Sequence, residues 1–144
     1  EIQTFVPPTP ENTWSVVGQF NELMQTTIKR TKRAIMLITP NIRDVPVDAI
    51  KKLDNTVHVL IITQLEAKTK DEERILRELY QLGNVRIKQG EGINYRIVWR
   101  DNEEVLIAPK DMESLGIISE DPSYVAMIDK LLRPEVARAV EVLL

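Results

Sequence analysis

The chain has 144 residues, of which 43% are hydrophobic and 28% charged, a composition typical of one soluble globular domain with its own core. Its net charge of −3 and pI of about 5.3 give the molecule as a whole no electrostatic attraction to nucleic acids or to membrane surfaces. The sequence contains no cysteine, which excludes disulfides, thiolate metal sites and cysteine nucleophiles and fits a cytoplasmic location.

Residues 1–12 include three prolines and predict an extended lead-in or linker. They have neither the basic nor the apolar segment of a signal peptide, and the longest apolar runs, at 34–40 and 56–63, are too short to span a bilayer. We therefore expect no membrane partner and one domain at 13–144. Because the chain begins at Glu1 rather than Met, we expect it to be part of a longer protein.

The first half of the domain predicts alternating helices and strands. Two continuous apolar segments, at 34–40 and 56–63, predict strands buried on both faces, and residues 45–53 predict a short helix between them. A first helix begins after Asn12 or Thr13 and ends on the basic run Lys29–Arg33. Its apolar positions recur at helical spacing: Trp14, Val17, Phe20, Met24 and Ile28.

Thr69 and Glu72 have the spacing of a capping box, which predicts a helix that ends at Gly83. A strand at 85–88 follows, and then a hairpin of strands at 93–100 and 103–109 that turns at Asp101 and Asn102. A further strand is predicted at 123–129. Pro134 suits the first turn of a last helix that continues through Val136, Val140 and Leu143.

This order of elements, with parallel strand–helix–strand units first and hairpins later, predicts an α/β domain of three layers. Its central sheet is expected to be mixed, mostly parallel, and flanked by helices on both faces. Phosphate-binding loops and the serine nucleophile elbow are absent from the sequence. The sole histidine, His58, lies in an apolar strand and is expected to be a packed or edge residue, so we predict no metal site and no cofactor.

The hairpin places polar residues at an unusual spacing: Asn94, Arg96 and Asp101. This pattern resembles the H-x-K-x4-D motif of the phospholipase D superfamily, with VLIAP where that family has a second strand ending in Gly-Ser. The flanking segments NELMQTTIKRTKRAIMLITPNI, NVRI and SYVAMIDKLLRPEVARAV resemble that family's opening helix and strand, the strand before the motif, and the closing elements. The resemblance covers nearly the whole chain from about residue 13 and implies a phospholipase D-like fold.

The departures from the motif concern the chemistry. In the family, the histidine attacks phosphorus and the lysine holds the phosphoryl oxygens. The amide of Asn94 has no available nitrogen lone pair for this attack, and Arg96 keeps the charge of lysine without its compact ammonium group. The family's active site also combines two motifs, whereas this chain has one. We therefore expect the chain not to be an enzyme.

Single degenerate domains of this kind resemble the C-terminal effector domains of TrmB-type archaeal transcription regulators. The resemblance implies a homodimer, a possible small-molecule effector such as a sugar or phosphorylated metabolite, and DNA binding through a missing N-terminal module. We expect any ligand to lie at Asn94, Arg96 and Asp101, with Tyr95 or Trp99 as a wall. The plainer interpretation is that Arg96 and Asp101 pair on the hairpin and that the aromatic side chains pack under a helix.

Two alternatives remain open. A nucleic-acid-binding module would use the basic run Lys29, Arg30, Lys32 and Arg33 together with Arg96 and Arg100, although that run also suits the dipole of a helix C-terminus. The minor alternative is a phosphodiesterase-like hydrolase.

Overall fold

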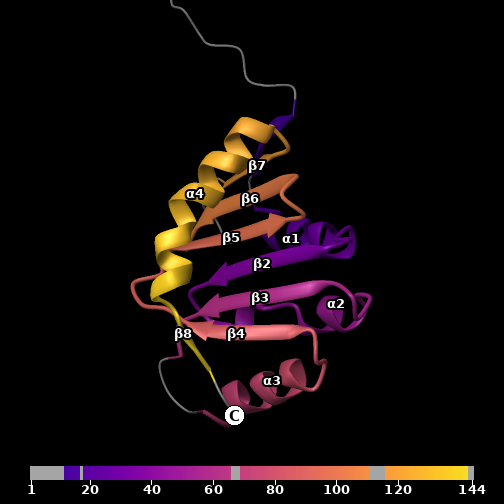
Figure 1. Cartoon of the computed structure of the whole chain (residues 1–144), viewed down its shortest axis with the longest axis vertical. Coiled ribbons are helices and arrows are strands. Elements are labelled where there is room, and N and C mark those ends of the chain that lie inside the picture. Colours follow the sequence, from indigo (N-terminus) through magenta and orange to yellow (C-terminus); the bar gives the residue numbers. More distant parts are fainter. Residues whose placement is uncertain (1–11, 17, 66–68, 111–115, 143–144) are drawn as a thin grey trace, which may run out of the picture.

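The computed structural model describes residues 12–16, 18–65, 69–110 and 116–142. One sheet forms its centre, with the described strands in the order β1-β7-β6-β5-β2-β3-β4-β8 (Figure 1). The strands are β1 Thr13–Val16, β2 Ala34–Thr39, β3 His58–Thr63, β4 Val85–Gln89, β5 Tyr95–Arg100, β6 Glu104–Pro109, β7 Gly116–Ser119 and β8 Val140–Glu141. The helices are α1 Phe20–Lys29, α2 Val47–Lys51, α3 Lys70–Tyr80 and α4 Pro122–Arg138, with a 3-10 turn, η1, at Ile42–Asp44.

The sheet is mixed, as predicted. Among the described strands, β2 pairs with β3 and β3 with β4 in parallel, and the remaining five ladders are antiparallel. The parallel part is therefore the smaller one, because β5, β6 and β7 add to the sheet as hairpins and the two edge strands run antiparallel to their neighbours. The expectation of a mostly parallel sheet overestimated the parallel part.

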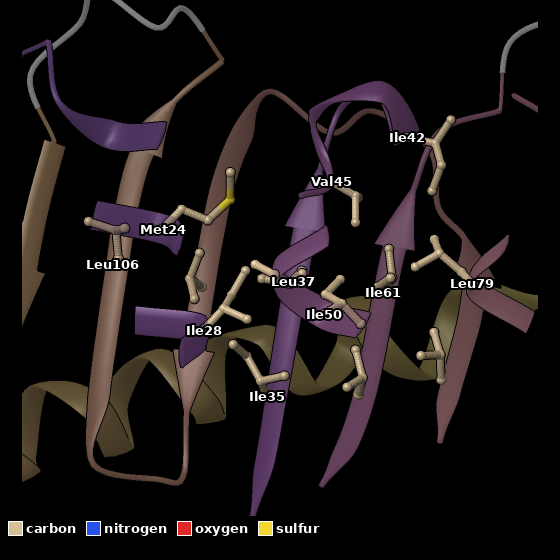
Figure 2. Packing of buried hydrophobic residues seen from close by; sticks show 14 of the residues in the cluster. Met24, Ile28, Ile35, Leu37, Ile42, Val45, Ile50, Ile61, Leu79 and Leu106 are labelled. Carbon is tan, nitrogen blue, oxygen red and sulfur yellow. The ribbon is translucent and has the colours of Figure 1, made fainter. Parts of the chain in front are cut away.

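Helices cover both faces of this sheet, which confirms the three-layer prediction (Figure 1). The larger core cluster joins α1, α2 and α3 to one face, and Figure 2 shows Met24, Ile50 and Leu79 from these helices packed over the strands. α4 crosses the other face alone, over a smaller cluster. None of the helices in the described ranges combines the length and the apolar character of a membrane span.

The strands predicted from continuous apolar sequence are buried on both faces. In β2, Ile35 and Leu37 face the larger cluster, whereas Met36 and Ile38 face α4. Each successive side chain of a strand points to the opposite face, so a strand between two helix layers needs apolar residues at every position. This explains why the sequence of β2 shows no alternation.

α3 begins where the capping pattern predicts. The hydroxyl of Thr69 accepts a hydrogen bond of 3.2 Å from the backbone N–H of Glu72, which satisfies one of the free amides of the first turn. After α3, Gly83 has a φ of +76°, a conformation that residues with a side chain rarely adopt.

The first helix is shorter than predicted. Residues 13–16 form β1, antiparallel to β7, and α1 begins only at Phe20. Gly18, with a φ of +66°, separates the two elements. Trp14 fitted the helical spacing but is 50% exposed on the edge strand, and Val17 lies outside the described residues.

The prediction for the end of the chain was wrong. Residues 123–129, expected as a strand, belong to α4, which places Val125, Ile128 and Leu132 on the sheet at helical spacing. Pro122 occupies the first turn, and Pro134, expected there, lies inside the helix on its exposed side. Two strands, β7 and β8, were not predicted, and Val140, expected in the last helix, lies in β8.

Candidate functional site

The motif lies on the hairpin of β5 and β6. Asp101 and Asn102 turn the chain with φ values of 52° and 57°, and residues 101–103 connect the paired Arg100 and Glu104. Along β5, Tyr95, Ile97 and Trp99 face α4, and the residues between them face α1. This alternation places Arg96 and the aromatic residues Tyr95 and Trp99 on opposite faces of the sheet.

Asn94 and Arg96 lie near the carboxyl end of β2, since Ile97 pairs with Ile38. Asn94 is exposed and directly precedes β5. Arg96 is 1% exposed, and its guanidinium carbon lies 4.2 Å from the centroid of the Phe20 ring on α1. The first motif position is therefore open to solvent, whereas the second is part of the core.

Asp101 lies at the other end of β5 and fastens the hairpin to the start of β2. Its carboxylate accepts hydrogen bonds of 2.8, 2.7 and 2.8 Å from the backbone N–H groups of Lys32, Arg33 and Ala34. Burial raises the pKa of Asp101, but these hydrogen bonds and the charge of Arg100 outweigh burial and hold the pKa below its usual value. A carboxylate held in this way orders the backbone.

The five residues predicted for a ligand do not share one cleft. At a rise of about 3.3 Å per residue, the five steps from Arg96 to Asp101 span roughly 16 Å, too far for the two side chains to pair. The charged partner of Asp101 is Arg100, at 3.3 Å. Tyr95 and Trp99 lie on the face opposite Arg96 and pack against the α4 cluster.

Two pockets lie on the α4 face, and Asn94, Arg96 and Asp101 line neither. Tyr95 lines a pocket of about 670 Å³ together with the loop after β4 and the end of α4, including Glu135. Burial raises the pKa of Tyr95, and the negative charge of Glu135 adds to this effect. Trp99 lines a second pocket, of about 590 Å³, at the opposite end of the sheet from Asn94.

Three arginines of the predicted basic patch, Arg30, Arg33 and Arg100, pair with acids. Arg30 donates two hydrogen bonds, of 2.8 and 2.9 Å, to the buried carboxylate of Glu104, which also accepts one of 3.0 Å from Arg100. Arg33 pairs with Glu103 at 3.2 Å. Burial lowers the pKa of Arg100, but Glu104 and the neighbouring acids keep it above its usual value. Lys29 and Lys32 of the run are exposed.

Two roles were not predicted: Phe20 as the partner of Arg96, and Glu104 as the link between two arginines. Phe20 was expected only as an apolar helical position. No local pattern distinguishes these roles, because α1 and the hairpin are far apart in the sequence. Within the described ranges, no three His, Asp or Glu side chains gather to hold a metal ion.

Solved structures similar to this chain include a chromatin protein and a phospholipase D family member. TrmBL2, an archaeal chromatin protein whose structure shows a novel mode of DNA binding, has a TM-score of 0.75 at 16% identity, covering 92% of this chain and 55% of TrmBL2. NucT from Helicobacter pylori has a TM-score of 0.72 at 12% identity. Nuc from Salmonella typhimurium, a phospholipase D family member, has a TM-score of 0.69 at 12% identity. The matches to NucT and to Nuc each cover 90% of this chain and 98% of the matched protein.

The sequence matches no protein-family model and no curated protein. This chain spans about half of TrmBL2, at 55%, but nearly all of Nuc and NucT, at 98%. At identities of 12–16% the likeness concerns the fold, and it agrees with the resemblance inferred from the motif and its flanking segments. The chain therefore has a phospholipase D-like fold, with a mixed sheet flanked by helices. In this fold it resembles TrmB-type proteins.

Proposed function

We propose that this chain is a non-catalytic regulatory domain of a cytoplasmic transcription regulator, which senses an effector, forms a homodimer, or does both. The observation that supports this most is the state of the two motif positions. Asn94 is an exposed amide where the phospholipase D motif has its nucleophile, and Arg96 is 1% exposed where the motif has a phosphate-holding lysine.

A phosphoryl group at the end of β2 would meet no nucleophile of the required kind. The amide nitrogen of Asn94 is not nucleophilic, because its lone pair is delocalised into the carbonyl. The sole histidine, His58, is the first residue of β3, whereas Asn94 lies beyond the last residues of β2 and β3. The guanidinium of Arg96 is covered by the core and stacks on Phe20, so it offers no surface to a substrate.

The regulatory part of the proposal draws on the likeness to TrmBL2. That protein binds DNA, and this chain covers 55% of it, which leaves room in such an architecture for a separate DNA-binding module. We place that module outside the present sequence. A homodimer of the domain would set two such modules one helical turn apart on DNA, and an effector with different affinities for two domain arrangements would change their spacing.

The first experiment measures thermal unfolding of the chain with sugars, sugar phosphates, nucleotides, small carboxylic acids and a short DNA duplex. Hydrolysis of bis(4-nitrophenyl) phosphate is followed in parallel. A ligand that binds only the folded state adds about 2.7 kcal/mol of stability at a hundred times its dissociation constant. We expect a saturable rise in Tm with a small molecule, a dimer in sedimentation, and no turnover.

Turnover that disappears in Asn94→Ala would contradict the proposal, because Asn94 is exposed and its removal leaves the core intact. A rise in Tm with the duplex alone, steeply reduced by salt, would instead support the nucleic-acid-binding alternative.

A further inference from the structure

The Trp99 pocket exists because α4 covers only part of its face of the sheet. A helix is about 10 Å wide with its side chains, whereas eight strands at about 4.8 Å span close to 40 Å. The three other helices all lie on the opposite face (Figure 1). Near the starts of β2 and β3 the sheet face is therefore open, and a pocket of about 590 Å³ lies there, within the usual range of roughly 300–1,000 Å³ for small-molecule sites.

The floor of this pocket is one row of side chains across four strands. Trp99 pairs with Met36, Met36 with Leu60, and Leu60 with Arg86, so the four stand side by side in register. The first three form a flat apolar strip about 10 Å long at the usual strand spacing. Arg86 ends the strip with a positive charge. Leu132 of α4 forms part of the apolar wall.

Two arginines, a histidine and an aspartate, Asp129, also line the pocket. Arg86, His58 and Arg133 line the pocket, and the arginine side chains are 64% and 77% exposed. Arg86 donates one hydrogen bond, from Nε to Glu141 at 2.7 Å, and Arg133 reaches Asp129 at 3.2 Å. A guanidinium has five N–H donors, so both keep donors directed elsewhere.

Trp99 contributes apolar surface to the pocket. Its indole Nε1 is buried and, within the described part of the chain, has no hydrogen-bond partner. Because protein atoms cover this N–H, it is closed to a ligand, and the indole serves as part of the apolar strip.

We infer that this pocket binds a small organic anion with a flat apolar body about 10 Å long that ends in a single carboxylate. The apolar body lies along Trp99, Met36 and Leu60, and the carboxylate meets Arg86 and Arg133. A singly charged group fits better than a phosphate, because Asp129 and Glu141 already pair with the two guanidinium groups. The inference rests on the proposed function and gives its effector a site and a class, in place of the sugar or phosphorylated metabolite expected at the motif.

Intrinsic fluorescence tests this directly, because the chain has two tryptophans. In Trp14→Phe only Trp99 reports. This variant is titrated with 4-phenylbutyrate, with octanoate, and with 4-phenylbutyramide, which has the same shape as the first probe but no charge. We expect a saturable change in Trp99 emission with the acids and about tenfold weaker binding of the amide.

Variants on exposed positions locate the binding site. Ala137 lines the pocket on α4, and Ala137→Phe should weaken the acids at least tenfold by filling the space. Ala126→Phe, on an exposed α4 position that does not line the pocket, is the matched control and should bind normally. Arg133→Gln should weaken the acids but not the amide.

Equal affinity for acid and amide, unchanged binding in Ala137→Phe, or no emission change up to millimolar probe would each overturn the inference. An effector whose thermal stabilisation is the same in Ala137→Phe would leave the proposed function standing and remove this site. Phosphodiester turnover would contradict the proposed function, and the fluorescence titration would still show independently whether the Trp99 pocket binds the acids.

Discussion

The guanidinium carbon of Arg96 stands 4.2 Å above the centroid of the Phe20 ring, with the arginine side chain inside the core. A cation over an aromatic face is attracted by the quadrupole of the ring, and the attraction is larger where water is excluded. A position that serves phosphate binding in the phospholipase D motif is here a packing position between α1 and the hairpin.

A double-mutant cycle measures this contact. Phe20→Leu and Arg96→Met should each destabilise the protein, and we expect the two changes to be non-additive by about 0.5–2 kcal/mol in urea unfolding. The pair Phe20→Leu and Arg43→Met, with Arg43 exposed near η1, should be additive. A coupling of zero between Phe20 and Arg96 would contradict the stacking interpretation.

Asp101→Asn should lower the free energy of unfolding at pH 7 by about 2–4 kcal/mol, because a neutral amide replaces a buried carboxylate that accepts three backbone hydrogen bonds and pairs with Arg100. The folded pKa of Asp101 is below its usual value. Its charge-dependent stabilisation is therefore complete above the unfolded value of about 3.9 and is lost as pH falls through the folded pKa. The difference in the free energy of unfolding between wild type and Asp101→Asn should be constant from about pH 5 to about pH 7 and shrink below about pH 4. A difference that stays constant down to about pH 2 would contradict this.

Glu104 and Glu103 are adjacent acids with different expected contributions. The Glu104 side chain is 1% exposed and bonds both Arg30 and Arg100, so Glu104→Gln removes the buried negative charge that the two arginines share and should cost about 2–4 kcal/mol. Glu103 is 60% exposed, and Glu103→Gln should change stability by less than about 1 kcal/mol. Similar losses of unfolding free energy for both variants, measured by urea unfolding, would show that burial does not make Glu104 contribute more to stability than Glu103.

Restoring the motif should not restore its chemistry. Asn94→His combined with Arg96→Lys places the family's residue types at both positions, but position 96 lies under Phe20 and its side chain does not reach solvent. We expect hydrolysis of bis(4-nitrophenyl) phosphate to stay at the level of Asn94→Gln. Turnover in the double variant that is absent from Asn94→Gln would show that the core around position 96 opens to substrate.

Pro134 lies inside α4, where it lacks the N–H that would bond to the carbonyl four residues earlier. Pro134→Ala should therefore raise the free energy of unfolding, by about 1–2 kcal/mol after allowance for the greater freedom of the unfolded chain. Lys130→Ala, exposed on the same helix, should change it by less than about 0.5 kcal/mol. A loss of stability in Pro134→Ala would mean that the helix depends on a bend at this residue.

Local patterns predicted most of the elements correctly. Continuous apolar runs located β2 and β3, the Thr69 cap located the start of α3, and the Asp101-Asn102 turn located the hairpin. These features depend on residues close in sequence, whose preferences are nearly independent of the rest of the fold. The same reasoning failed for α4, because its apolar segment is short enough to suit either a strand or a helix, and the packing of Val125 and Leu132 on the sheet decides between them.

The sequence by itself determined that the domain is α/β and that a phospholipase D-like motif lacks its nucleophile. Only the tertiary structure decided what each motif residue does. It buries Arg96 under Phe20, turns Asp101 toward the backbone at the start of β2, and leaves a pocket next to Trp99. The physical reason is that burial and charge pairing depend on which distant segments pack together, and local side-chain patterns do not specify that packing.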